Sequence, residues 1–136
     1  MVTRKTITMA TLLAILSVAL VAPAAMLSAD TTEVEIDVAP GTLNLSYNGQ
    51  WVTVHTDLTY TLGEGLDWYL NDVLAEDEDV FSDDCGNLVA KFDVQAFTVP
   101  DVVKLGNQQM VLEGRDGETV VYSGSSTIRV INVGKR

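Results

Sequence analysis

The sequence predicts an all-β protein, an antiparallel β-sandwich of the immunoglobulin-like type with about seven to eight strands after an N-terminal signal peptide. Beyond residue 30, apolar and polar side chains alternate with a period of two, which is the pattern of half-buried strands. The strand-like segments are short, recur at roughly ten-residue intervals and are separated by turn residues. A closed β-barrel produces the same pattern and stays open as the alternative. The length of 136 residues fits one domain.

Residues 1–29 have the composition of a secretory signal peptide. Arg4 and Lys5 precede an apolar run over residues 9–22, and small residues follow it. The run is shorter than the ~20 residues that cross a bilayer comfortably. We expect cleavage after Ala29 or Ala24, with an uncleaved N-terminal anchor as the alternative. The predicted domain is residues 30–136, secreted to the extracellular space or the periplasm, with no membrane span after signal cleavage.

The charge of the chain excludes several partners. The formal net charge is −11, and removal of Arg4 and Lys5 with the signal, which carries no acid, would make it −13. An acidic protein is repelled by nucleic acids and by anionic membranes, so neither is an expected partner. A single His and a single Cys exclude a multi-His metal centre, a Cys-rich metal site and an intramolecular disulfide.

The first hairpin is predicted around Asn48 and Gly49, because Asn-Gly between alternating segments is a strong turn pattern. That register would pair residues 42–47 with 51–58. Other turns are expected at residues 116–117 and 123–124. The predicted strands are residues 33–38, 42–47, 51–58, 66–73, 87–94, 108–113, 118–122 and 126–133.

The outward face of this predicted hairpin is a candidate ligand-binding surface. Its residues are Asn44, Trp51, Thr53 and His55. An aromatic ring beside hydroxyl and amide groups suits a sugar or a peptide, because the ring stacks on apolar surfaces. The alternative is a Trp that packs under a loop or a neighbouring subunit.

The acidic segment between residues 64 and 84 is the candidate metal site. It holds nine carboxylates and no Lys or Arg, and calcium prefers six to eight oxygen ligands. The spacing does not match an EF-hand loop. The alternative is a solvated loop that keeps the protein soluble. The candidate ligands are Asp77, Asp79, Asp83, Asp84 and Asn87.

Four separated segments of the chain resemble a loosely defined family of secreted bacterial and archaeal immunoglobulin-like modules. They are residues 35–45, 51–57, 84–92 and 122–131, which include the runs WVTVHTD, GNLVAKF and GSSTIRVI. The resemblance implies a β-sandwich in an extracellular place. It brings no established activity and no catalytic residue.

One segment departs from the family pattern. Before the VAKF strand, family members can carry an Asp-x-Asp-x-Asp-Gly run. The matching positions here read Phe81, Asp83, Cys85 and Gly86, so a single acidic position of the three is kept.

These observations together predict a non-enzymatic interaction module of the cell surface or extracellular space, without catalytic residues and without a cofactor other than the calcium considered above. Its expected partner is a protein or a polysaccharide at the cell surface. One alternative is a structural subunit that self-associates by exchanging its N-terminal strand into a filament or layer. The other alternative is a calcium-dependent adhesion module or a carbohydrate-binding accessory module.

Overall fold

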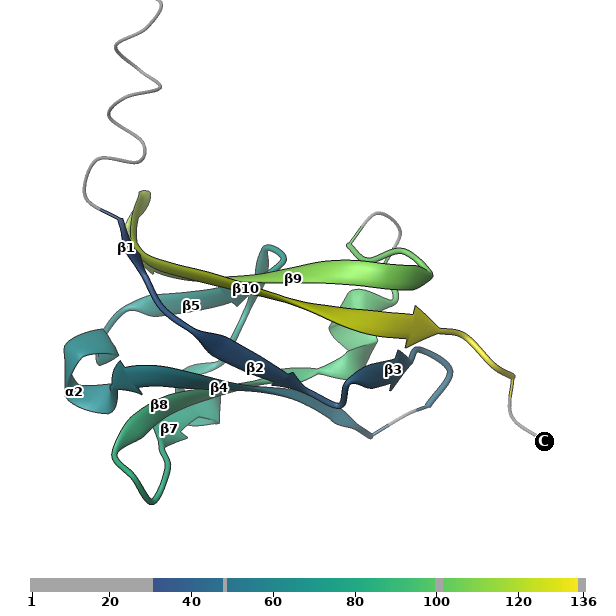
Figure 1. Ribbon diagram of the computed structural model, residues 1–136, viewed down its shortest axis with the longest axis horizontal. Coiled ribbons are helices and arrows are strands. Elements are labelled where there is room, and N and C mark those ends of the chain that lie inside the picture. Colours follow the sequence, from purple (N-terminus) through teal and green to yellow (C-terminus); the bar gives the residue numbers. More distant parts are fainter. Residues whose placement is uncertain (1–30, 48, 100–101, 135–136) are drawn as a thin grey trace, which may run out of the picture. The chain divides into compact units, whose positions relative to one another are not determined.

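The computed structural model describes residues 31–47, 49–99 and 102–134, which form two β-sheets packed face to face (Figure 1). The predicted all-β sandwich is therefore confirmed. The larger sheet has the order β1 (Thr32–Glu33), β10 (Thr119–Ile131), β9 (Gly106–Asp116), β5 (Asp67–Leu70) and β6 (Val73–Leu74), with β3 (Thr42–Asn44) also paired to β10. The smaller sheet has the order β2 (Ile36–Ala39), β4 (Trp51–Thr59), β8 (Asn87–Asp93) and β7 (Val80–Ser82).

Helical structure in the described residues is limited to short turns between strands. They are the α-helical turn α2 (Tyr60–Gly63) and the 3₁₀ turns η1 (Asp77–Asp79) and η2 (Val94–Phe97). The predicted signal peptide, residues 1–29, lies outside the described residues.

The core lies between the two sheets and follows from the alternation of apolar residues. In β4, Val52, Val54, Thr56 and Leu58 point inward and are buried, whereas the residues that alternate with them are more exposed. The same alternation holds in β9 and in the second half of β10, whereas in β8 the outward Val89 is buried as well. The core is built from Val34, Val38, Leu43, Val52, Val54, Leu58, Trp68, Leu70, Ala75, Leu88, Ala90, Phe92, Val94, Phe97, Met110, Leu112, Ile128 and Val130.

The N-terminal segment joins both sheets. β1 pairs in parallel with β10, and the backbone N–H of Val34 extends this contact by donating to Ser123 O at 2.9 Å. The chain then crosses to the smaller sheet, where β2 pairs antiparallel with β4. β3 returns to the larger sheet and pairs in parallel with the end of β10 (Figure 1). β1, β2 and β3 are thus all paired with strands of the same chain.

Trp68 lies on the inner face of the larger sheet, in β5. Its indole is 1% exposed, donates from Nε1 to Gly63 O at 3.1 Å and stacks with Tyr122 at a centroid distance of 6.2 Å. Gly114 lies on β9 between the two rings, since it pairs with Trp68 on one side and Tyr122 on the other. The absence of a side chain at this position leaves the space that the indole occupies.

Three sequence-based predictions are corrected by the structure. The described residues form ten strands rather than seven to eight, because β1, β6 and β7 are added and the last two predicted strands are one continuous β10. The hairpin around Asn48-Gly49 does not form as a pair, since β3 and β4 belong to different sheets. Ser123 and Gly124 lie within β10 instead of in a turn.

Candidate functional site

The outer face of the smaller sheet carries three of the four residues predicted to bind a ligand. Trp51, Thr53 and His55 alternate along β4 with the buried Val52 and Val54, so they point away from the core. Trp51 is 41% exposed, and His55 is also exposed. The structure therefore brings these three side chains onto one surface, as the alternation predicts.

Asn44, the fourth predicted residue, lies elsewhere. It ends β3 in the larger sheet, and its Oδ1 accepts hydrogen bonds from Ser46 N at 3.1 Å, Ser46 Oγ at 2.9 Å and Val133 N at 3.1 Å. The prediction that Asn44 joins the face of Trp51 was wrong, because it assumed the hairpin that does not form. Asn44 instead ties the turn after β3 to the chain that leaves β10.

Phe81, Val89 and Lys91 extend the surface that Trp51 begins, and Asp93, the direct partner of Trp51, lies at its border. Val89 on β8 pairs with His55 on one side and with Phe81 on the other, and Lys91 pairs with Thr53. Because directly paired residues of antiparallel strands project from the same side of a sheet, all of them share the outer face. We call this surface the aromatic face and define it as Trp51, Thr53, His55, Phe81, Val89 and Lys91.

The aromatic face is packed, although it lies outside the core. Val89 is only 1% exposed and yet does not belong to the cluster between the sheets. Nζ of Lys91 lies 4.6 Å from the centroid of the Trp51 ring, a cation–π contact. Phe81 keeps 39% of its surface exposed. The face thus presents two large aromatic side chains around a buried Val.

Sequence reasoning missed Phe81 because it lies in a three-residue strand inside the acidic segment. The alternation there is too short to distinguish a strand from a loop. Val89 and Lys91 lie on one side of the predicted strand over residues 87–94, but the sequence does not show which strand lies beside it. Only the register of β4 with β8 places them next to Thr53 and His55.

The predicted metal ligands are spread over three elements. Asp77 and Asp79 lie in η1, Asp83 and Asp84 belong to the turn between β7 and β8, and Asn87 begins β8. Among the residues that the structure describes, no three His, Cys, Asp or Glu side chains are grouped closely enough to hold a metal ion. The calcium site stays a prediction.

Asp83 has a clear structural role in this turn. Its Oδ1 accepts hydrogen bonds from Cys85 N at 2.8 Å and from Asn87 N at 2.9 Å, and Gly86 has a positive φ of 85°. This carboxylate shapes the tight β7–β8 turn, because Asp side chains commonly bond backbone N–H groups a few residues ahead. Cys85 lies exposed at its tip.

A second polar cluster lies on the outer face of the larger sheet. Arg115 bonds Asp72 Oδ1 from Nη2 at 2.9 Å and Glu113 Oε1 from Nε at 3.0 Å, and its guanidinium carbon lies 4.0 Å from the centroid of the Tyr69 ring. The hydrogen bond to Glu113 is the main cause that raises the pKa of Arg115. Arg115 thus contacts two carboxylates and one aromatic ring of the protein itself. We therefore interpret the cluster as part of the structure of the sheet surface.

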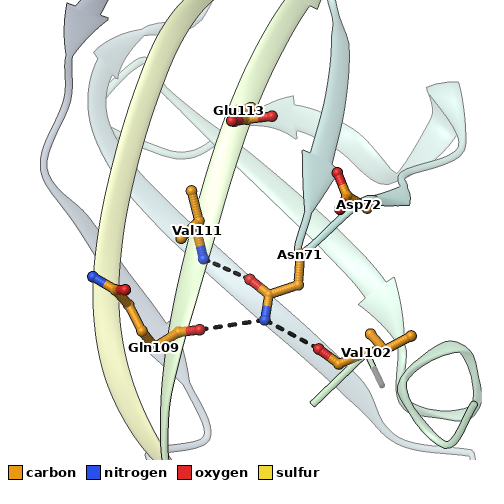
Figure 2. Close-up of a pocket in the computed structure, with 6 residues that line it drawn as sticks. All are labelled: Asn71, Asp72, Val102, Gln109, Val111 and Glu113. Atoms are coloured by element: carbon orange, nitrogen blue, oxygen red, sulfur yellow. Dashed lines mark hydrogen bonds between the residues drawn. The ribbon is translucent and has the colours of Figure 1, made fainter. Parts of the chain in front are cut away.

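Asn71 anchors the wall of an adjoining cleft of about 400 Å³ (Figure 2). Its Oδ1 accepts from Val111 N at 2.7 Å, while Nδ2 donates to Gln109 O at 3.3 Å and to Val102 O at 3.5 Å. Figure 2 shows the amide between β9 and the segment of Val102. Both ends of the amide form hydrogen bonds with backbone groups, so the Asn71 side chain holds the walls of the cleft together and is not free to bind a ligand.

No protein-family model matches the sequence, and no curated protein or solved structure matches it either. In the described part of the chain, no helix is both long and apolar enough to cross a membrane.

Proposed function

We propose that the protein is an exported, non-enzymatic interaction module of the cell surface or extracellular space, and that it binds its partner through the aromatic face. The observation that carries this proposal is the exposure of Trp51 and Phe81 on the outer side of a sheet whose inner side is fully packed. Large aromatic side chains that stay partly exposed are the residues that most often dominate binding energy.

The location is supported by the sequence. The basic start, apolar run and small residues of positions 1–29 favour export, and the resemblance to secreted modules points the same way. Three β-strands hold the aromatic face, which suits recognition because side chains on strands are positioned more firmly than side chains on loops.

Binding of the labelled, purified protein to envelope material from the producing cells tests this proposal. Wild type should be retained, and Trp51→Ala should reduce retention by about tenfold, the effect of losing a binding hot spot. Leu105→Ala is the matched control, because Leu105 is a large apolar residue that is 62% exposed on the loop before β9. Equal retention of wild type and Trp51→Ala, or no retention of wild type, would overturn the proposal.

A further inference from the structure

We infer that the ligand of the aromatic face is an uncharged polysaccharide. This inference rests on the function proposed above and adds the chemical class of the partner. Four properties of the face carry it: its size, its charge, the hydrogen-bonding capacity of its polar groups and its flat shape.

The aromatic side chains occupy a small part of the outer face, which is enough for contact with a narrow chain. Trp51 and His55 are four residues apart on β4, which is about 13 Å, and His55 and Phe81 are two strands apart, which is about 10 Å. The surface between these side chains is therefore on the order of 130 Å². A stable protein–protein interface buries about 800 Å² on each partner. A polymer that contacts the protein along one row of side chains needs far less.

The negative net charge of the protein disfavours anionic polymers. A net charge of −11 repels anionic glycans, as it repels nucleic acids. The face itself carries one cation, Lys91, while two carboxylates lie on the same side of the sheet, Asp37 across from His55 and Asp93 across from Trp51. The net charge of this surface is thus small and negative, so it disfavours an anionic chain and suits a neutral one.

The polar groups of the face match hydroxyl groups. Thr53 donates and accepts, Lys91 donates, and Asp37 accepts. Sugar hydroxyls both donate and accept, so they can satisfy all three. The apolar side of a sugar ring can stack on the exposed part of Trp51, whose orientation is fixed from one side by Lys91.

The flat shape of the site also favours a polymer. Trp51, His55 and Phe81 lie on the open surface of a sheet and do not line the cleft of Figure 2, whose walls belong to the larger sheet and to Val102. A small free sugar gains most of its affinity from enclosure. A repeating chain can instead add weak contacts along its length.

The experiment is a depletion assay with insoluble neutral polysaccharides, namely cellulose, chitin and mannan, and with immobilised pectin and heparin as anionic probes. We expect the protein to be retained on at least one neutral polymer and on neither anionic one. Trp51→Ala should weaken retention by about tenfold, and Phe81→Ala by a few-fold, since both remove surface-exposed aromatic area. Leu105→Ala should bind like wild type.

A second measurement separates this inference from the general proposal. Soluble oligosaccharides of the retained polymer should protect the fluorescence of Trp51 from acrylamide. If the protein binds cell envelopes through Trp51 but no neutral polysaccharide, the polysaccharide inference is wrong and the interaction module stands. If Trp51→Ala changes neither assay, both fail. Circular dichroism of each variant shows whether the sandwich is intact.

Discussion

The ammonium nitrogen of Lys91 lies 4.6 Å from the centroid of the Trp51 ring on the outer face of the smaller sheet. The two residues come from the neighbouring strands β8 and β4, so the contact crosses from one strand to the next and favours one orientation of an exposed ring. At an exposed site such a contact contributes about 0.5–1 kcal/mol. The contact therefore adds little to the stability of the fold and acts mainly on the orientation of the exposed Trp51 ring.

The two Trp residues of the chain should report separately in fluorescence. Trp51 is 41% exposed, whereas Trp68 is 1% exposed. We expect acrylamide to quench one part of the emission readily and to leave the other part nearly unchanged. Trp51→Phe should remove the quenchable part and shift the remaining emission to shorter wavelength. Quenching of both populations to the same degree would contradict the placement of the two rings.

Gly114→Ala should destabilise the protein strongly. A Cβ at this position would lie 2.7 Å from Cη2 of Trp68, in a core where the indole has no free direction in which to move. We expect a loss of about 1–3 kcal/mol in the free energy of unfolding, measured by urea titration. Gly41→Ala is the matched control, since a Cβ there meets no atom within 4 Å. The idea fails if the two variants unfold at the same urea concentration.

Asn71→Ala should also lower the free energy of unfolding, although Asn71 lies in a two-residue turn. Its φ of 47° suits Asn better than Ala, and the substitution leaves Val111 N without the amide oxygen that it bonds at 2.7 Å. We expect a loss of about 2–4 kcal/mol.

The neighbouring residue supplies the control for this turn. Asp72 also has a positive φ, and Asp72→Asn keeps a residue that tolerates it while losing the ion pair with Arg115. The Asp72 side chain is 87% exposed, so the pair contributes less than about 1 kcal/mol. Comparable losses in both variants, by thermal or urea unfolding, would show that the amide of Asn71 is not the anchor.

The fold class could be predicted because the alternation of side chains reflects burial directly. β4 and β8 each have one apolar side that faces the core, and both were located within one residue of their ends. The turn at Asp116 and Gly117 was also located, and it joins β9 to β10. These features are set by residues that lie close together in the sequence, so a single sequence is enough to predict them.

The pairing of β3 could not be predicted, because its partner is distant in the sequence. β10 is 13 residues long, and its end offers an edge that β3 fills in parallel. The Asn-Gly pattern describes a local turn and contains no information about this edge. As a result, the sequence-based prediction placed Asn44 beside Trp51 on the smaller sheet, whereas Asn44 lies in the larger sheet and does not belong to the aromatic face.

The Gly at position 124 shows a different limit. In a sequence, Gly beside Ser indicates a turn, since Gly adopts positive φ easily. In the structure, Gly124 lies within β10, and a Cβ would collide with the carbonyl oxygen of Val34 where the chain crosses between sheets. A Gly that is needed for space cannot be distinguished from a Gly that is needed for conformation until the crossing chain is known.

Processing of residues 1–29 is the remaining prediction, and intact mass spectrometry of the exported protein measures it. We expect a mature chain that begins at Asp30 or at Ala25, because small residues precede both positions. Leu13→Asp should block export by interrupting the apolar run, and the precursor should then stay in the cytoplasm. Ala29→Arg distinguishes the two positions, since it prevents cleavage at the first and permits it at the second. An exported chain of full length that remains with the membrane would identify the segment as an anchor instead.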